Sequence, residues 1–348
     1  MTDATATALT PLAVTMGDPA GIGIEITLMA WQRRRELALP PFALYADPSG
    51  VAATAARLGI AAALAPLDRE EQAASAFATH LPIRPVTLAR AATPGQPDSA
   101  NGPAVVSAID TAAAAVLAGR ARAVVTNPIA KSVLHVAGFT HPGHTEYMAV
   151  LAERARPGTR YVPVMMLACD ELRVVPLTVH VPIAAVPRLI TPALIRETAR
   201  TTHAALQRDF GIAAPRIAVA GLNPHAGESG SIGREDHDVI APALAALRRD
   251  GLAISGPHSA DTLFHPAARA RYDAVIAMYH DQALIPLKTL AFDRGVNVTL
   301  GLPFARTSPD HGTAFDIAGR GTASPESLIA ALRMADAIAR RRAAAPAA

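Results

Sequence analysis

The sequence predicts an α/β protein with largely parallel sheets, folded as two lobes. Short apolar runs such as PLAVTM (residues 11–16) and RIAVAGL (residues 216–222) alternate with longer segments of helical periodicity. Buried strands of parallel sheets read as continuous apolar runs separated by helices, and this pattern repeats along the chain. Apolar residues form 51% of the 348 residues, enough for a substantial core.

The expected elements follow in order along the chain. Strands are predicted at residues 11–16, 42–47, 123–126, 162–168, 172–180, 216–222 and 273–280. Helices are predicted at residues 21–37, 49–59, 101–121, 146–155, 192–211, 234–251 and 323–343. No flexible linker divides the chain, so we expect the two lobes to be joined by crossing segments.

Composition excludes several classes of protein. A net charge of +3 without a basic cluster, and an aromatic content of 4%, argue against nucleic-acid binding. The single cysteine, Cys169, excludes an internal disulfide and a cysteine-based zinc cluster. The N-terminus lacks the features of a signal peptide, and no stretch approaches the ~20 apolar residues of a membrane helix. We therefore expect a cytoplasmic protein that binds neither nucleic acid nor membrane.

Lysine is rare in this chain. Only Lys131 and Lys288 are lysines among the 32 basic residues, so arginine is the ordinary surface cation. The two lysines either mark places where a compact, titratable ammonium group is used or are incidental surface residues.

Three of the twelve histidines lie at the ends of predicted strands. His180 ends the strand at residues 172–180, His280 ends the strand at 273–280, and His225 follows the strand at 216–222. Ligands of open α/β sheets bind outside the carboxyl ends of the strands, and three protein ligands with an open position are typical of a catalytic zinc site. The alternative is that each histidine only caps its strand end.

Two further segments join predicted elements. GHTE (residues 143–146) precedes a helix that Thr145 is expected to cap, and His144 beside the helix N-terminus suits an anionic ligand or plain capping. GDPAGIG (residues 17–23) has neither the lysine of a P-loop nor the spacing of a dinucleotide fingerprint, so a tight turn is the better interpretation.

The segment DHGTAFDIAGRG (residues 310–321) resembles the adenosine-binding loop of the isocitrate and isopropylmalate dehydrogenases, usually HGSAPDIAGKG. Phe315 replaces the usual proline. The resemblance implies a cofactor site at His311, Gly312 and Asp316, with Asp316 bonded to the adenosine ribose. Because an anionic Asp316 would repel a 2′-phosphate, we expect NAD as the cofactor, with NADP as the alternative.

Longer blocks carry a more specific resemblance. TNPIAKSVLHVAGFTHPGHTEY, GLNPHAGESGSIGREDHDVI, YHDQALIPLK and GVNVTLGLPFARTSPDHGTAFDIAGRG are similar to the 4-hydroxythreonine-4-phosphate dehydrogenases of vitamin B6 (pyridoxal 5′-phosphate) biosynthesis, from about residue 12 to 335. This family implies the two-lobed isocitrate/isopropylmalate dehydrogenase-like fold with a central cleft. We place a discontinuous cofactor-side lobe at residues 1–138 and 283–348. The metal ligands and dimer contacts fall in the lobe at residues 139–282.

The resemblance also implies the site residues. Three histidines bind one divalent metal (zinc, magnesium or cobalt) at the interface of a homodimer with shared active sites, one of them from the partner subunit. The matching positions are His180, His225 and His280, of which we assign His280 to the partner's contribution. The implied contacts to a small phosphorylated substrate are His144, Thr145, Lys288, Asn297 and Arg306.

The implied reaction oxidises the C3 hydroxyl of 4-phosphooxy-L-threonine, with hydride transfer to NAD, and the resulting β-keto acid loses carbon dioxide. The general base stays open between Asp281, beside a metal ligand, and Asp261, while Lys131 is a site neighbour without an assigned role. Asp281 alternatively orients the imidazole of His280. Which cation meets phosphate and which meets carboxylate also stays open.

Three other functions compete with this one. Paralogous dehydrogenases act on 4-phosphorylated threonate or erythronate, or on dihydrodiol dicarboxylates. A metal hydrolase and a non-catalytic metal-binding protein would use the same histidines, but neither needs the adenosine loop.

Overall fold

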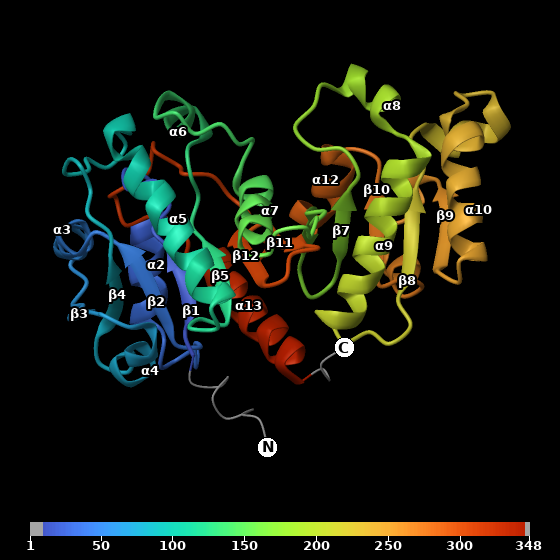
Figure 1. Cartoon of the computed structure of the whole chain (residues 1–348). Coiled ribbons are helices and arrows are strands. Elements are labelled where there is room, and N and C mark those ends of the chain that lie inside the picture. Colours follow the sequence, from blue (N-terminus) through green and yellow to red (C-terminus); the bar gives the residue numbers. More distant parts are fainter. Residues whose placement is uncertain (1–9, 345–348) are drawn as a thin grey trace. The chain divides into compact units, whose positions relative to one another are not determined.

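The computed structural model describes residues 10–344. Residues 1–9 and 345–348 lie outside this range, and with them much of the N-terminal segment expected to lack a signal peptide. Two compact units make up the described chain, residues 10–161 with 302–344 and residues 162–301 (Figure 1). The boundaries predicted from the sequence are residues 138 and 282.

The first unit contains a wholly parallel sheet. In spatial order its strands are β3 (Leu64–Pro66), β4 (Leu81–Pro85), β2 (Phe42–Ala46), β1 (Leu12–Thr15), β5 (Ala123–Thr126) and β12 (Ala305–Pro309). Its helices are α2 (Gly23–Gln32), α3 (Pro48–Leu58), α4 (Ala73–Ala76), α5 (Gly102–Leu117), α6 (Lys131–Val136), α7 (His144–Ala155) and α13 (Glu326–Ala344). The central strands β1, β2 and β5 are entirely buried, as continuous apolar runs predict.

One helix of this unit has the length and composition of a membrane span. Ser99–Leu117, which is α5 with the short 3₁₀ turn before it, passes by apolarity and length, and 56% of the segment is buried within the fold. The expectation that no stretch approaches a membrane helix is therefore wrong by composition. Because α5 packs on β1, β2 and β5, its apolar residues cover the sheet.

The second unit contains a mixed sheet. In spatial order its strands are β11 (Val296–Leu300), β6 (Val164–Ala168), β7 (Arg173–Pro176), β10 (Ala274–Ala277), β8 (Arg216–Ala220) and β9 (Ala253–His258). The last four run parallel, whereas β6 is antiparallel to both of its neighbours. The prediction of an α/β fold with largely parallel sheets is confirmed.

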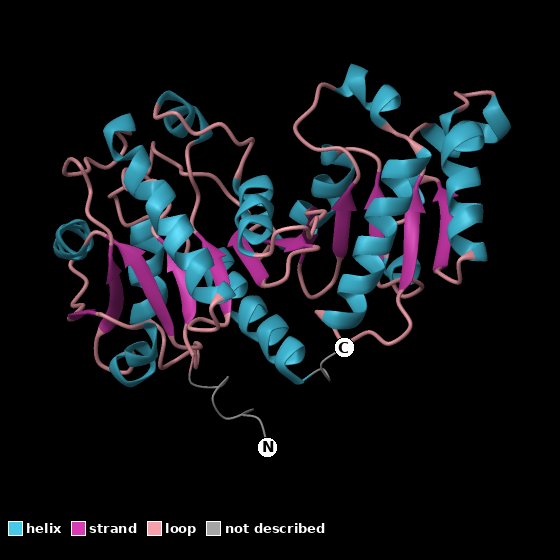
Figure 2. Cartoon of the chain, in the orientation of Figure 1, coloured by secondary structure: helices cyan, strands magenta, loops and turns pink. Residues whose placement is uncertain are grey.

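Helices accompany the strands of the second unit, as they do in the first (Figure 2). They are α8 (Val186–Leu189), α9 (Pro192–Arg208), α10 (Ala241–Arg249), α11 (Pro266–Arg269) and α12 (His280–Ala291). A core cluster of this unit joins β7, β8 and β10 to α12 through residues such as Val174, Ala218, Val275 and Leu287. This packing fixes the start of α12 against the strand ends.

Several element boundaries differ from the prediction. The strand expected at residues 172–180 ends at Pro176, and His280 is the first residue of α12 rather than the last residue of a strand. The helix after residue 143 begins at His144 with Gly143 as its N-cap, so the expected capping by Thr145 is wrong. Because Thr145 lies inside the first turn, its side chain is beyond the position from which a cap acts.

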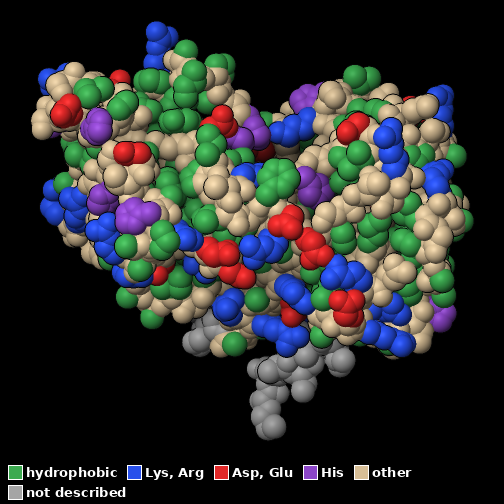
Figure 3. Space-filling model, turned by 180° about the vertical axis from the view of Figure 1, so that it is seen from behind, with side chains coloured by type: hydrophobic (Ala, Val, Ile, Leu, Met, Phe, Trp, Pro, Cys, Tyr) green, Lys and Arg blue, Asp and Glu red, His purple; other side chains and the backbone are tan. Residues whose placement is uncertain are grey.

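Both acidic and basic side chains lie on the face shown in Figure 3, and the two kinds are neighbours in the lower middle of this view. The net charge of the chain is +3.

Candidate active site

Two side chains tie together the carboxyl ends of β7, β10 and β8. These strands are neighbours and run parallel, so their ends share one edge of the sheet. Thr178 Oγ1 donates to the carbonyl oxygen of Met278 at 2.8 Å. Gln282 accepts from the Met278 N–H at 2.7 Å and donates to the carbonyl oxygen of Gly221 at 2.8 Å. Neither role is predicted from the sequence, although both side chains connect the three segments that carry the predicted histidine ligands.

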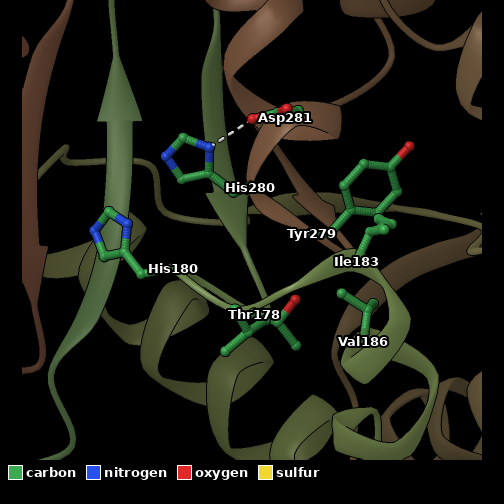
Figure 4. Close-up of a pocket in the computed structure, with 8 residues that line it drawn as sticks. Thr178, His180, Ile183, Val186, Tyr279, His280 and Asp281 are labelled. Atoms are coloured by element: carbon green, nitrogen blue, oxygen red, sulfur yellow. Dashed lines mark hydrogen bonds and ion pairs between the residues drawn. The ribbon is translucent and has the colours of Figure 1, made fainter.

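His180 and His280 come together at this edge. Their ring centroids lie 5.4 Å apart, and both rings line a cavity of about 320 Å³. His280 Nδ1 lies 2.8 Å from Asp281 Oδ1, and its other ring nitrogen points to the side where His180 lies (Figure 4). The remaining lining residues are Thr178, Val181, Ile183, Val186 and Tyr279.

This pair of imidazoles has a separation suited to metal ligation. Metal–nitrogen bonds of about 2.0–2.1 Å place the centroids of two imidazoles on one tetrahedral ion roughly 5 Å apart. A carboxylate on one ring nitrogen fixes the tautomer that leaves the other nitrogen's lone pair for a ligand, which is the position of Asp281. Within residues 10–344 of one chain, no group of three or more His, Cys, Asp or Glu side chains is arranged to hold a metal ion.

His225 stands at the start of a left-handed turn. Residues 225–229 all have positive φ, between 41° and 78°, and His180 has φ 49°. Left-handed backbone costs roughly 1–2 kcal/mol for each residue with a β-carbon. Strain of this kind persists only where surrounding contacts over-determine the conformation, and it concentrates at functional sites.

Asp236 anchors the left-handed turn. Its buried carboxylate accepts from the N–H groups of Leu222 and Asn223 at 2.8 and 3.0 Å and from Asn223 Nδ2 at 2.9 Å. A β-carbon at Gly233 would lie 2.6 Å from Asn223 Nδ2, so only glycine fits there. Asp236 therefore sets where the segment carrying His225 leaves β8.

The two candidate bases of this unit differ in surroundings. Asp261 accepts from Ser259 Oγ at 2.5 Å, and this bond lowers the pKa of Asp261, with a smaller contribution from the nearby charge of His225. A lowered pKa makes a carboxylate a weaker base. Asp281 is exposed and contacts His280, so its position fits orientation of that ring.

Lys288 and Asn297 also belong to the second unit. Lys288 lies on α12, with its Nζ 5.3 Å from the ring centroid of Phe292. Asn297 lies on β11, and its Oδ1 is buried without a hydrogen-bond partner among residues 10–344. A buried oxygen of this kind favours a donor from a bound ligand.

In the first unit, Arg306 and His144 form a second cluster. The buried Arg306 guanidinium donates to Thr126 Oγ1 at the end of β5 at 2.6 Å. A β-carbon at Gly143 would lie 3.5 Å from both Lys131 Nζ and Glu146 Oε2, which places the lysine beside the start of α7. Thr126 was missed in the sequence, although it belongs to the TNP segment before Lys131.

This cluster favours an anion. Burial holds the pKa of His144 well below its ordinary value, and the charges of Arg306 and Lys131 lower it further. Burial also lowers the pKa of Arg306 to about 10, against the smaller opposing effect of Glu146. The Nε2 of His144 is buried without a hydrogen-bond partner in the described chain. A phosphate or carboxylate would stabilise the buried cation and accept a hydrogen bond from the imidazole.

The predicted adenosine loop forms a separate part of the first unit. His311 Nδ1 lies 3.1 Å from the carbonyl oxygen of Gly312, and Asp316 is exposed. The side chain of Asp316 makes no hydrogen bond or ion pair within residues 10–344, so it is accessible to a ligand.

Comparison with known proteins agrees over nearly the full length. Residues 39–335 match the model of the family described as pyridoxal phosphate biosynthetic protein PdxA. The chain is 58% identical over 334 residues to 4-hydroxythreonine-4-phosphate dehydrogenase of Methylorubrum populi, covering 95% of each chain. A crystal structure of 4-hydroxythreonine-4-phosphate dehydrogenase from Klebsiella pneumoniae is similar, with a TM-score of 0.82, 37% identity, and coverage of 95% of this chain and 99% of that one.

A more distant solved structure is the terephthalate 1,2-cis-dihydrodiol dehydrogenase from Burkholderia xenovorans. It is 30% identical, with a TM-score of 0.61, and the match covers 94% of this chain and 98% of that one. Fold and relatives together define an α/β oxidoreductase. The chain belongs to the PdxA family of pyridoxal phosphate biosynthetic proteins, which confirms the predicted resemblance. A dehydrogenase of this family implies a nicotinamide cofactor and a divalent metal.

Proposed function

We propose that this protein is a cytoplasmic, metal-dependent dehydrogenase that oxidises 4-phosphooxy-L-threonine with NAD and releases carbon dioxide and 3-amino-2-oxopropyl phosphate. The observation that carries the proposal is the likeness, over 95% of the chain, to a relative bearing the name of this activity. In the reaction, the C3 hydrogen leaves as hydride to NAD and the hydroxyl proton leaves to a base. The bond between the carboxyl carbon and C2 then breaks.

The first unit supplies the groups proposed for an anionic end of the substrate. Arg306 is fixed by Thr126 and forms the charged part of this site. His144, which its surroundings keep neutral, presents Nε2 as a hydrogen-bonding group, and Thr145 follows it in the first turn of α7. In the second unit we propose Lys288 and the buried Oδ1 of Asn297 as substrate contacts.

We propose that His180, His225 and His280 hold the divalent metal, which is zinc, magnesium or cobalt. A divalent ion held by these residues would lower the pKa of the substrate hydroxyl and stabilise negative charge on its oxygen. The separation of His180 and His280, and the carboxylate of Asp281 behind His280, support the assignment. We assign Asp281 to orientation of His280 and keep Asp261 and Lys131 as candidates for proton transfer.

We further propose a homodimer with shared active sites. Ile285 on α12 and Phe292, the C-cap residue of this helix, are 64% and 77% exposed, and they lie seven residues apart on the same face as Asp281 and Lys288. Large exposed apolar side chains among functional residues are typical of a surface that a partner covers. Among residues 10–344 of one chain, the proposed metal ligands include one close imidazole pair and no group of three, which supports a third ligand from the second copy.

Mixing inactive single variants determines how the ligands are divided. A heterodimer of two such variants contains one intact site only if the two histidines that were replaced normally come to each site from different subunits. If His280 is the partner's ligand, mixtures of H280A with H180A or with H225A recover activity, and H180A with H225A does not. If His180 and His280 act from one chain, as their 5.4 Å separation suggests, only mixtures containing H225A recover. Failure of all three mixtures, with heterodimers verified, would contradict sharing.

The preference for NAD is assigned to Asp316. Changing it to lysine replaces a charge that repels a 2′-phosphate with one that attracts it, worth roughly 1 kcal/mol per close pair in water. D316K should therefore shift the ratio of kcat/KM values toward NADP by about fivefold or more. An unchanged ratio would remove Asp316 from the ribose site.

The test of the function is NADH formation, followed by absorbance, with a panel of substrates. We expect a higher kcat/KM for 4-phosphooxy-L-threonine than for the three other substrates, which are phosphorylated threonate, phosphorylated erythronate and terephthalate dihydrodiol. The dihydrodiol is the second candidate, because of the 30% identical relative that bears the name of that activity. Turnover of the dihydrodiol without turnover of phosphooxythreonine would overturn the proposal.

A further inference from the structure

The start of α2 holds the predicted adenosine loop in place. The Ile22 N–H donates to the carbonyl oxygen of Thr313 at 3.1 Å, and the Gly319 N–H donates to Glu25 Oε2 at 2.8 Å. These bonds reach both sides of Asp316, and they connect segments of the first unit almost 300 residues apart in the sequence. The GDPAGIG segment therefore does more than form a tight turn between β1 and α2.

Glycines bring these segments into direct contact. A β-carbon at Gly21 would lie 2.9 Å from the carbonyl oxygen of Thr313, closer than side chains pack. A third segment closes the arrangement, because Gly95 donates its N–H to Ala20 at 2.8 Å and lies against the carbonyl oxygen of Phe315. The backbone of the loop at residues 313–319 is thus packed against backbone on two sides.

Glu25 is an unusual residue for this position. It lies in the first turn of α2, where a carboxylate is favoured by the helix dipole, but its side chain is only 1% exposed. Its Oε1 has no hydrogen-bond partner among residues 10–344. A buried carboxylate is costly, so its contact with Gly319 must serve the structure or the function of the loop.

We propose that Glu25 is a positioning residue for the nicotinamide cofactor. By fixing the Gly319 end of the loop, it determines where Asp316 and His311 stand when the adenosine part of the cofactor binds. Gly21 acts with Glu25 by allowing the Thr313 end to approach α2. The inference rests on the proposed use of NAD, and it assigns to GDPAGIGIE a role in cofactor affinity without contact to phosphate.

Two measurements test this proposal separately from the proposed function. Hydrogen exchange of the peptide containing residues 310–322 reports the fixation of the loop without cofactor. Calorimetric titration with NADH reports affinity. In E25A we expect faster exchange in this peptide and an NADH Kd about tenfold higher, the effect of losing one hydrogen bond to a charged group. KM for the phosphorylated substrate should stay within about twofold.

Conservative variants separate positioning from a general effect on folding. E25Q keeps an acceptor oxygen for Gly319 and should bind NADH within about threefold of the parent. G21A leaves Glu25 intact but displaces Thr313, and it should raise the Kd about tenfold. G50A is the matched control. Gly50 lies on α3, where an added β-carbon meets only ordinary contacts at 3.5 Å or more.

If E25A does not fold, G21A decides the question by the same two measurements. Parent-like exchange and parent-like NADH affinity in the folded variants would overturn the role of Glu25. Failure of the parent protein to bind NADH, with faster exchange in E25A, would instead overturn the cofactor assignment on which the inference rests.

Discussion

The same side chain has opposite surroundings in the two units. In the first unit, His144 is partly buried beside the cations Arg306 and Lys131, with its Nε2 fully buried, and burial together with these charges holds its pKa well below the ordinary value. In the second unit, His280 is partly exposed, faces His180, and has a carboxylate on Nδ1. Burial, reinforced by the two cations, disfavours protonation of the first imidazole, and a carboxylate orients the second.

This difference separates two chemical tasks. A neutral imidazole beside the buried Arg306 and the exposed Lys131 suits hydrogen bonding to a bound anion, because the cations supply the charge. An open imidazole whose far nitrogen is engaged by an acid suits metal ligation. Residue type alone does not distinguish the tasks, whereas the sign of the neighbouring charge does.

The largest expected effect comes from removing one imidazole of the His180–His280 pair. H280A should lose the metal and lower kcat/KM by about 10³-fold, because charge on the reacting oxygen is no longer stabilised. Metal content after dialysis and NADH formation are the measurements. The matched control is H237A, since His237 lies 2.7 Å from Asp238 in a similar adjacent pair but lines no part of the cavity. An H280A variant that keeps its metal and its activity would show that His280 is not a metal ligand, and the two units would then not differ in the tasks of their imidazoles.

The next effect tests the buried cation of the first unit. R306M should reduce kcat/KM by about 10²-fold, the effect of losing a charged anion contact. Because burial lowers the pKa of Arg306, its charge is disfavoured in the fold, and R306M should be at least as stable as the parent in urea. R122M is the control: burial lowers the pKa of Arg122 as well, but its removal takes a partner at 2.8 Å from the Asp336 carboxylate, so stability should fall by about 1–3 kcal/mol while activity remains. A destabilised but fully active R306M would show that Arg306 is structural.

The sequence predicts the composition of these sites better than their shapes. Apolar strand runs locate β1, β5, β8 and β10, and the histidines follow from the rule that ligands bind at strand ends. The left-handed turn at residues 225–229 is not predictable in this way, because residues with β-carbons disfavour it. It depends on Asp236, which is eleven residues beyond His225 in the sequence.

Boundaries failed where side chains far apart in the sequence decide them. His280 starts α12 because the strand ends at Ala277, and the Met278 backbone is bonded on one side by Thr178 and on the other by Gln282. No local pattern contains the first of these partners. The low pKa of His144, which is caused first by burial, likewise depends in part on the charge of Arg306, 162 residues away (306 − 144).

A smaller effect is expected from changing Asp281, the carboxylate beside the His180–His280 pair. D281N keeps the shape of the side chain but removes the negative charge next to His280 Nδ1. The affinity for zinc, measured by competition with a chelator, should fall by about 10–100-fold. If instead the affinity is unchanged and kcat falls with a shifted pH profile, Asp281 is the base rather than the orienting group. D238N, at the comparable His237 pair outside the cavity, should change neither quantity.

The smallest expected effect concerns His144 and is measured as a change in the stability of the fold with pH. The folded-state pKa of His144 lies below its ordinary value of 6.5, so below about pH 6.5 the unfolded chain binds a proton that the folded chain does not. The free energy of unfolding should therefore fall as pH decreases through this range, by up to ~1.4 kcal/mol per pH unit from this group, and show no such dependence above it.

Urea unfolding at pH 5.0 and 7.5 should show a smaller loss in H144Q than in the parent protein. H135Q, which removes an exposed histidine of α6, should keep the parental difference. His258, whose pKa burial also lowers, contributes equally to all three proteins. Equal losses in H144Q and the parent would mean that His144 takes up a proton in the folded state, and the two units would then no longer differ in the charge of their imidazoles.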